Sequence, residues 1–484
     1  MSIVSLKATV LDANLKIFTS ETVHFDSELP RYKTRDGVCR DPSENGRISS
    51  PTLMWVEALD LLLQKLVKAQ LDFGKITAIS GSAQQHGSVY WKKGSSAVLA
   101  SLDPKKLLVE QLADAFSIKE SPIWMDCSTT VQCREIEDAV GGAFKLAQLT
   151  GSRAHERFTG PQIRKIFQKR PDVYHDTGRI SLVSSFMASI LIGDYANLDE
   201  TDGSGMNLMD VKQRVWSRIA LEATVPNLEE NLGKLAPAYN VAGHIAPYFV
   251  QRYKPKIFVL KTWLSILQQK YETDDFNLLK MLSGLTLSSP GDLAISLGTS
   301  DTVFGVAVDP QPSLEGHVLP NPVDRRYYMV MLVYKNGSLT REYVRNQHAE
   351  KSWDVFNKFL QETPPLNVGF HRYVLDNFLS NSLDDWREYG VEEFDSCSEV
   401  RAIIEGQLLS MRAHMERSGL PGTPKRIIAT GGASTNESIL NAIASIFGCS
   451  VYTVQRPGLF SKYTSFMKKR MEIEDCLVQK LGRS

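Results

Sequence analysis

The residues best suited to chemistry in this 484-residue chain lie in short polar motifs that follow apolar runs. One motif is Gly298-Thr299-Ser300, a tight turn between the apolar runs 292–297 and 302–308. Its small side chains, two hydroxyls and accessible backbone amides are suited to holding a phosphate group. An ordinary hairpin turn has the same composition, so this motif alone is weak evidence for a phosphate site.

A second motif, "ATGGASTNESIL", places Gly431-Gly432 between a predicted strand at 426–432 and a predicted helix at 436–448. Glycines at such a junction let a nucleotide approach the backbone, and the start of the helix near Asn436 attracts phosphate. A strand–helix turn with glycines for close packing is the alternative. Because both motifs occur in the same half of the chain, together they favour a nucleotide site.

The first half of the chain carries polar loops that fit a polyol rather than a phosphate. In "SGSAQQHGSVYW", Gln84, Gln85 and His86 follow the apolar run 75–80, and ligands of open α/β sheets bind at such strand ends. Amides and an imidazole can hydrogen-bond sugar hydroxyls, although a structural histidine fits equally well. Other polar residues lie in loops where both a structural role and a ligand-binding role fit: Asp126, Arg153, Glu156, Arg157, Asp199 and Asp202.

The elements that must position these motifs follow a similar order in the two halves. Strand-like runs, a helix with apolar residues at helical spacing, and a further strand occur in each half. The helix of the first half is expected to begin at Ser50-Pro51, with the serine as its N-cap. The repeated order predicts a duplicated α/β fold with a cleft between its halves. The expected elements are strands at 6–11, 17–25, 75–80, 327–334 and 450–454, and a helix at 397–417.

Composition excludes several classes of partner. Lysine plus arginine equals aspartate plus glutamate, 55 each, so no net field attracts nucleic acid or an anionic membrane. There is no apolar run of about 18 residues and no secretory leader at Met1, so we expect a cytoplasmic protein. The six cysteines form no Cys-x-x-Cys pair, which argues against a zinc site or a disulfide framework.

The motifs, taken in order, closely resemble those of the FGGY carbohydrate kinases. The matching stretches include SPTLMWVEALDLLL, SGSAQQHGSVYW, WMDCSTTVQCREIE, LTGSRAHERFTG, DGSGMNL, GDLAISLGTSDT, LEGHV and ATGGASTN. The resemblance implies a duplicated actin/RNase H-like two-domain fold with an interdomain cleft. It also implies an N-terminal sugar-binding domain at 1–254 and a C-terminal ATP-binding domain at 291–454.

The resemblance is closest to the members that act on D-xylulose, and it implies ATP-dependent formation of D-xylulose 5-phosphate with Mg²⁺. It implies that His86, Gln85 and Arg157 bind the sugar hydroxyls. It also implies a monomer, with no protein-bound metal site. The residues that would bind ATP are Gly298, Thr299 and Ser300 at the phosphates, Trp353 beside the adenine, and Gly431, Gly432 and Asn436.

The chain departs from the family pattern at three places. The first phosphate hairpin of the family, with its aspartate, is expected before the strand at 6–11, and no such motif stands there. The junction 255–290 lacks the Gly-Asp-Asn-Pro stretch that carries the expected general base, and Asp274 and Asp275 stand in an unrelated context. The tail 455–484 is atypical as well. No catalytic residue is therefore assigned.

These departures leave alternatives open. The chain is either an active xylulose-phosphorylating enzyme or an impaired isoform that binds sugar or nucleotide with little turnover. Another FGGY kinase, acting on ribulose, gluconate or glycerol, is disfavoured by the motif "AQQHG" and by the length of the match. An actin-like ATPase without a sugar substrate is disfavoured by the polyol-suited loop at 80–91.

Overall fold

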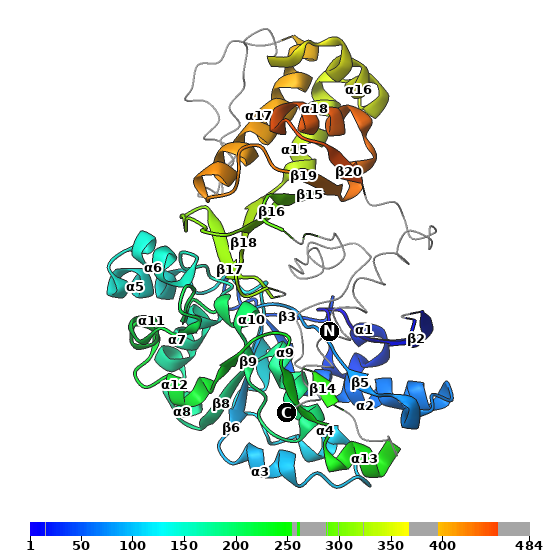
Figure 1. Cartoon of the computed structure of the whole chain (residues 1–484). Helices are drawn as coiled ribbons and strands as arrows, with labels where there is room; N and C mark the ends of the chain where they lie inside the picture. Colours follow the sequence, from blue (N-terminus) through cyan, green and yellow to red (C-terminus); the bar gives the residue numbers. More distant parts are fainter. Residues whose placement is uncertain are drawn as a thin grey trace.

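The chain folds into two lobes, which Figure 1 shows one above the other. The N-terminal lobe runs from the first strand to residue 261, and the C-terminal lobe runs from residue 287 onward. This computed structural model describes residues 1–14, 16–253, 259–261, 287, 289–298, 300–322, 324–366 and 395–453. The predicted junction 255–290, apart from 259–261, 287 and 289–290, and the predicted tail 455–484 lie outside the described residues.

The C-terminal lobe is built on one six-stranded sheet with the strand order β17-β18-β16-β15-β19-β20. The strands are continuous apolar runs because both faces of the sheet are covered. Strand β15 pairs antiparallel with β16 and parallel with β19, which makes it a central strand. The strands are β15 (Asp292–Leu297), β16 (Asp301–Ala307), β17 (Gly316–Pro320), β18 (Tyr328–Tyr334), β19 (Arg426–Thr430) and β20 (Val451–Thr453).

Four helices of the C-terminal lobe share a core with one face of this sheet. Their apolar residues pack with Leu293, Ile295 and Leu297 of β15. The predictions for this lobe are confirmed to within about two residues at most element ends, including the helix at 397–417 and the hairpin around Gly298. The helices are α15 (Gly337–His348), α16 (Trp353–Glu362), α17 (Ser396–Arg417) and α18 (Glu437–Phe447).

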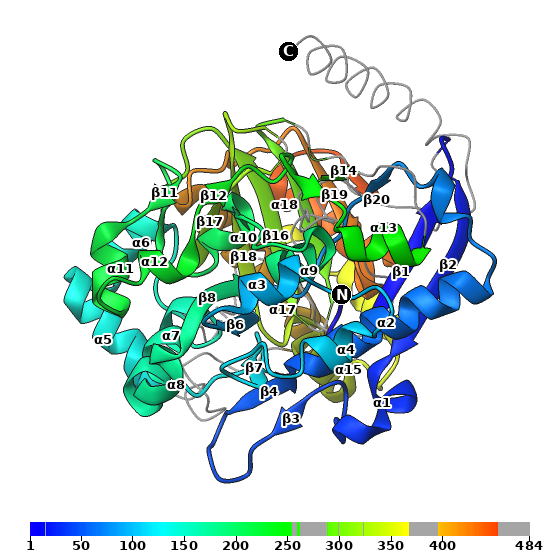
Figure 2. The same cartoon turned by 90° about the horizontal axis from the view of Figure 1, so that it is seen from below.

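The N-terminal lobe has shorter strands, which pair in sheets of two or three among the described residues. The predicted strands at 6–11 and 17–25 are confirmed as an antiparallel pair, which lies at the margin of the lobe in Figure 2. The strands are β1 (Ser5–Leu11), β2 (Ile17–His24), β3 (Cys39–Arg40), β4 (Ile48–Pro51), β5 (Ala78–Ile79), β6 (Ser88–Lys92), β7 (Glu120–Pro122), β8 (Thr177–Leu182), β9 (Leu198–Asp199), β10 (Met209–Asp210), β11 (Val215–Trp216), β12 (Leu235–Ala236), β13 (Val241–His244) and β14 (Val259–Lys261).

The helices of the N-terminal lobe surround a core in which the ring of Phe186 packs against Trp55, Trp91 and Phe116. All four side chains are buried. The helices are α1 (Phe25–Glu28), α2 (Thr52–Lys68), α3 (Ser95–Ala100), α4 (Leu108–Gln111), α5 (Thr130–Val140), α6 (Ala143–Thr150), α7 (Thr159–Lys169), α8 (Pro171–His175), α9 (Val183–Ile192), α10 (Glu200–Ser204), α11 (Arg218–Thr224), α12 (Glu229–Leu232) and α13 (Pro247–Tyr253).

Two predictions for the N-terminal lobe are wrong in detail. The strand expected at 75–80 is only Ala78–Ile79, because a 3₁₀ turn capped by Asp72 occupies residues 73–75. This strand is also partly exposed rather than buried. Ser50 is not the N-cap of α2: it lies in β4, where its hydroxyl donates to the Gly37 carbonyl at 2.9 Å. Pro51 takes the N-cap position instead.

The two lobes meet where β17 lies against the N-terminal lobe. The Val318 amide donates to the Gly151 carbonyl at 2.8 Å. Gly151 has a φ of +85°, and a Cβ there would lie 2.1 Å from the Val318 oxygen, so only glycine fits this contact. The Thr201 hydroxyl donates to the Pro320 carbonyl at 3.3 Å. The lobes are thus joined by hydrogen bonds as well as by the chain.

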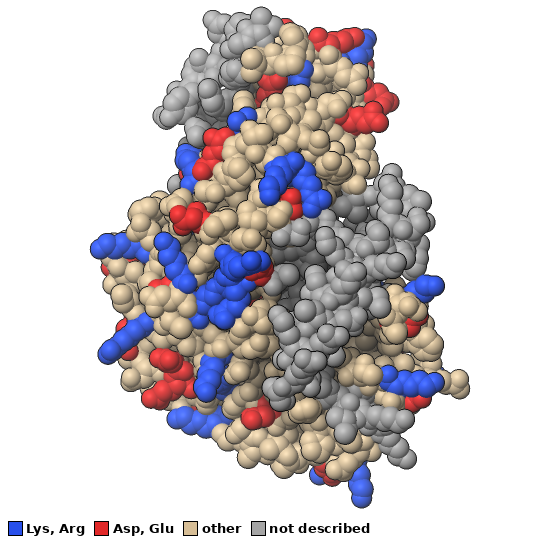
Figure 3. Space-filling model, viewed as in Figure 1, with Lys and Arg blue, Asp and Glu red and all other residues tan. Residues whose placement is uncertain are grey.

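The surface of the face drawn in Figure 3 carries basic and acidic side chains of both signs, interspersed among neutral ones. This agrees with the equal counts of the two charges in the sequence. Across the described residues, no helix combines the length and the apolar character that crossing a bilayer requires.

Candidate active site

The two glycine motifs of the C-terminal lobe lie at the same edge of its sheet. Strands β15 and β19 are parallel, with Ser296 opposite Thr430, so Gly298 and Gly431 both follow the carboxyl ends of neighbouring strands. Gly431 has a φ of +88°, and a Cβ there would lie 2.3 Å from the Leu297 oxygen. A Cβ on Gly432 would meet no atom within 4 Å, so this backbone is open to a ligand.

A buried ion pair supports the turn at Gly298. Asp301 and Arg341 are both almost fully buried, and two guanidinium nitrogens of Arg341 bind the two carboxylate oxygens of Asp301. Burial raises the pKa of Asp301, while Arg341 and the Gly298 backbone oppose this shift. The Ser338 amide donates to the Gly298 carbonyl at 3.1 Å. The start of α15 therefore fixes the shape of the turn.

The predicted adenine residue Trp353 lies at the start of α16, one turn before Asn357, which is bonded to Asn436 of the second glycine motif. Its indole is 39% exposed, and the Arg345 guanidinium lies 4.7 Å from its ring centre. Asn436 caps α18 by accepting from the Ser438 and Ile439 amides. Its side-chain amide also donates to Asn357 of α16 at 2.7 Å. Asn436 thus joins the two helices that border the predicted adenine site.

The structure therefore brings the predicted nucleotide residues together at one end of one sheet. Gly298, Ser300, Gly431 and Gly432 lie at strand ends, and Trp353 and Asn436 lie on the adjoining helices. Thr299 lies outside the described residues. Sequence reasoning missed the supporting residues Asp301 and Arg341, because Arg341 is remote in sequence and belongs to no motif.

His86, the predicted sugar residue of the N-terminal lobe, is held in an unusual backbone conformation. Its φ is +63°, which few residues other than glycine adopt. Its Nδ1 lies 3.0 Å from the Gly205 carbonyl, which can only accept, so Nδ1 carries the hydrogen. Burial, with the charge of Arg157, lowers the pKa of His86 to about 3. The ring is therefore neutral, and its Nε2 is a hydrogen-bond acceptor.

Arg157, the second predicted sugar residue, lies close enough to His86 for its charge to lower the pKa of the imidazole. It is half-buried, and burial lowers the pKa of its guanidinium. Among the described residues it has no hydrogen-bond or ion-pair partner. Gln85 is half-buried beside His86. A neutral acceptor and a donor without a partner among the described residues thus lie in the same region, which is the combination that sugar hydroxyls require.

A short helix, α10, connects His86 to the lobe junction. Gly205 at its end accepts from His86, while Glu200 at its start pairs with Arg325 of the C-terminal lobe at 2.8 Å. Asp199 caps the helix through the Thr201 amide at 2.6 Å. Burial raises the pKa of Asp199 to about 7 and that of Asp202 to about 6. The segment that contains Asp199 and Asp202, expected to be a loop, is therefore a short strand and helix that link the two lobes.

Two further buried groups near this region lack partners among the described residues. Both amide atoms of Gln84 are buried without a hydrogen bond, and so is one carboxylate oxygen of Asp202. The other Asp202 oxygen accepts from the Ser184 hydroxyl. Unpaired buried polar atoms are uncommon in folded proteins and often mark a water or ligand site.

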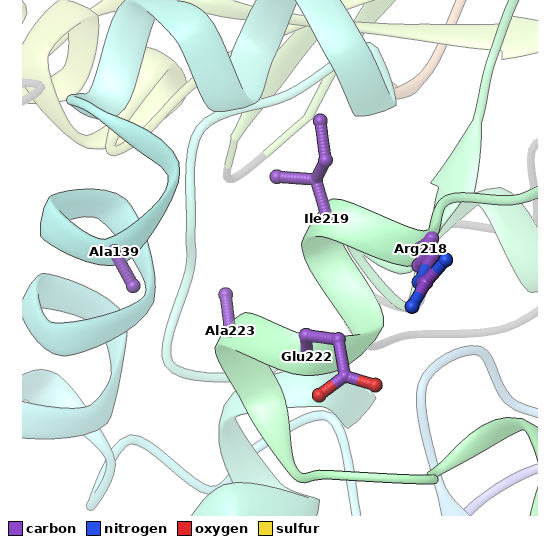
Figure 4. Close-up of a pocket in the computed structure, with 5 residues that line it drawn as sticks. All are labelled: Ala139, Arg218, Ile219, Glu222 and Ala223. Carbon is purple, nitrogen blue, oxygen red and sulfur yellow. The ribbon is translucent and has the colours of Figure 1, made fainter.

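Surface shape alone does not locate this site. A groove lies between α5 and α11 on the N-terminal lobe (Figure 4). None of the predicted site residues lines it. We assign no ligand to this groove. It is lined by Ala139, Arg218, Ile219, Glu222 and Ala223.

The catalytic base is not supplied by a described residue that we can identify. Asp274 and Asp275 lie outside the described residues. Across the described ranges there is no group of three or more His, Cys, Asp or Glu that could hold a metal ion. The carboxylate of Asp301, near the phosphate turn, is engaged by Arg341 and is not available as a ligand.

Glycine turns at the ends of parallel strands in one lobe, and polyol-suited side chains in the other, define a sugar kinase of the two-domain actin/RNase H-like fold. Models of the FGGY family of carbohydrate kinases match the chain in two parts, the N-terminal domain at residues 114–261 and the C-terminal domain at 293–458. The chain belongs to the FGGY family of carbohydrate kinases.

Two similar proteins illustrate the match. The chain is 58% identical to xylulose kinase 2 of Arabidopsis thaliana, over 99% of this chain and 96% of that protein. It is 45% identical to a xylulose kinase of Rattus norvegicus, over 93% and 83% of the two chains. The Arabidopsis match spans 547 positions, more than the 484 residues of this chain, so that relative has segments inside the match that this chain lacks.

Solved structures agree on the fold. A xyloylose kinase from Brucella ovis superposes with a TM-score of 0.70 at 18% identity, over 94% of this chain and 86% of that one. A glycerol kinase from Plasmodium falciparum with ADP gives 0.67 at 12% identity, over 96% and 87%. At these identities the likeness shows the fold alone, and it covers kinases of different sugars and polyols.

Proposed function

We propose that this chain phosphorylates D-xylulose to D-xylulose 5-phosphate with MgATP in the cytosol. The observation that carries the proposal is that two groups with unused hydrogen-bonding capacity lie near one another: the His86 ring, bound to the protein through Nδ1 alone, and the Arg157 guanidinium, which has no hydrogen-bond or ion-pair partner among the described residues. The names of the relatives at 58% and 45% identity support xylulose as the sugar. In this proposal residues 1–254 form the sugar-binding domain and residues 291–454 the ATP-binding domain.

In the proposed reaction the C5 hydroxyl of xylulose attacks the γ-phosphorus of ATP, the bond from that phosphorus to the bridging oxygen of ADP breaks, and the hydroxyl proton passes to water. The sugar is oriented by His86, Gln85 and Arg157. This orientation lowers the entropic cost of bringing the hydroxyl to the γ-phosphorus. The turn at Gly298 and the open backbone at Gly432 receive the phosphates, while Trp353 lies beside the adenine. Mg²⁺, carried by the phosphates, neutralises the developing charge.

The rate is expected to be low. General-base catalysis contributes about 10²–10⁴-fold, and the Gly-Asp-Asn-Pro stretch that would supply the base is absent from the sequence. The missing base favours a second candidate function, in which the chain binds xylulose and ATP without measurable turnover.

Calorimetry on His86→Ala tests the proposed site. The variant loses one acceptor for a sugar hydroxyl, so D-xylulose should bind about tenfold more weakly while ATP binds as before. Titrations of the wild type with ribulose, gluconate and glycerol establish whether xylulose is preferred. Equal loss of both ligands in His86→Ala would show that His86 is structural, and preference for another sugar would overturn the choice of xylulose.

A further inference from the structure

His317 is the second-domain residue that reaches the sugar side of the site. It lies in β17, in the motif "LEGHV", to which no role has been given so far. Its ring centre lies 4.9 Å from that of His155 and 5.5 Å from that of Phe158. Phe158 in turn lies 4.6 Å from His86. One continuous set of rings therefore joins the C-terminal lobe to the predicted sugar residue.

The hydrogen bonds of His317 fix which of its nitrogens carries a hydrogen. Its Nδ1 lies 2.7 Å from the Ser152 hydroxyl oxygen, and that hydroxyl donates its single hydrogen to the Arg153 carbonyl. The Ser152 oxygen must therefore accept from Nδ1. Burial and the charge of Arg157 lower the pKa of His317 to about 4, so the ring is neutral. Its Nε2 is left as an acceptor.

His317 thus repeats the arrangement of His86. In each ring Nδ1–H is bound to the protein, Nε2 is an acceptor, and the charge of Arg157 is near enough to lower the pKa. Both rings are half-buried, so part of each remains accessible. Arg157 has five N–H donors and no partner among the described residues, which leaves donors for both a ring nitrogen and a ligand.

We propose that His317 is a further residue of the sugar site, whose Nε2 accepts a hydrogen bond from a xylulose hydroxyl. This inference rests on the proposed function and adds to it a sugar-site residue from the ATP-binding lobe. A sugar in this site then contacts both lobes, so its binding depends on how β17 is seated against Ser152.

Three substitutions separate the roles of the two ring nitrogens. His317→Phe keeps the ring packing and removes both hydrogen bonds. His317→Gln places a polar atom near the position of Nε2, whereas His317→Asn places one near Nδ1 and preserves only the bond to Ser152. His244→Phe changes an exposed histidine of β13 and serves as the control. The full chain is titrated with D-xylulose and, separately, with ATP, and each variant is also melted.

We expect His317→Phe and His317→Asn to weaken xylulose binding about five- to tenfold, the effect of one neutral hydrogen bond. His317→Gln should stay within about threefold of wild type, and ATP affinity should not change in any variant. Wild-type affinity in His317→Phe, or the best retention in His317→Asn, would overturn the inference and leave the proposed function standing. A folded wild type that binds ATP but no xylulose would overturn both.

Discussion

In the C-terminal lobe, Gly298 and Gly431 end neighbouring parallel strands of a single six-stranded sheet. In the N-terminal lobe, His86 and Arg157 come from two separate loops, and Phe158 packs against both His86 and His317 of the other lobe. The nucleotide side is therefore shaped by backbone and by one buried ion pair. The proposed sugar side is shaped by side chains, one of which, His317, is brought there by the packing of the two lobes. Substitutions on the nucleotide side should therefore change stability, and those on the sugar side should change affinity.

The largest expected effect is on the ion pair behind the phosphate turn. Arg341→Met removes the partner of a buried carboxylate, and breaking such a pair typically costs about 3–5 kcal/mol. Urea unfolding should show this loss. The double variant Asp301→Asn/Arg341→Met removes the buried charge as well and should recover much of the stability. No recovery in the double variant would contradict the account of this pair.

The next effect is expected on the sugar side. Arg157→Ala removes the unpaired guanidinium, and a hydrogen bond to a charged group is worth about 1.5–3 kcal/mol, so D-xylulose should bind roughly 10–100-fold more weakly. The unfolding free energy and ATP binding should change little, because Arg157 has no partner among the described residues. Arg170→Ala, at an exposed arginine after α7, is the control. A variant that loses stability but keeps its xylulose affinity would reverse the assignment of Arg157.

A smaller loss is expected at the second glycine motif. In Gly431→Ala the new Cβ meets the Leu297 oxygen at 2.3 Å, and the residue must keep a φ of +88°, so we expect a loss of at least about 1–2 kcal/mol. In Gly432→Ala the same methyl group enters open space, and stability should change by less than about 0.5 kcal/mol. Urea unfolding of both variants measures the contrast, and equal losses would disagree with the geometry.

The last expected effect is a pH dependence at the link between the lobes. Burial and the nearby Asp202 raise the pKa of Asp199 to about 7 from an ordinary 3.8, so the folded chain holds a proton there that the unfolded chain releases earlier. The carboxyl therefore lowers stability progressively as pH rises from about 4 to about 7. Asp199→Asn should gain stability relative to wild type over that range and keep the gain above it.

Urea unfolding of Asp199→Asn and wild type at pH 5 and pH 8 measures this difference. Asp194→Asn, at an exposed position on the loop before β9, is the control and should show no such trend. A difference between Asp199→Asn and wild type that does not grow with pH would show that Asp199 keeps an ordinary pKa in the folded chain.

The contrast between the two lobes also explains which features the sequence could and could not predict. Gly298 and Gly431 were found because strand-forming runs and glycine turns are local patterns, and parallel pairing then places them together. Motifs also suggested His86 and Arg157 as sugar residues, and that role stays a prediction. The packing of His317 against Phe158 depends on how the two lobes meet, which no local pattern encodes. The strand expected at 75–80 failed for a similar reason, since the cap of Asp72 on a 3₁₀ turn competes with apolar periodicity.

Release of ADP by the purified 484-residue chain with MgATP, measured with and without D-xylulose, tests the central claim most directly. Ordinary kinases turn over at about 1–100 s⁻¹. We expect xylulose-dependent ADP release about 10²–10⁴-fold slower than that range, because the expected base is missing. A folded chain that binds both ligands and releases no ADP above the sugar-free background would contradict the proposed reaction and leave a protein that only binds them.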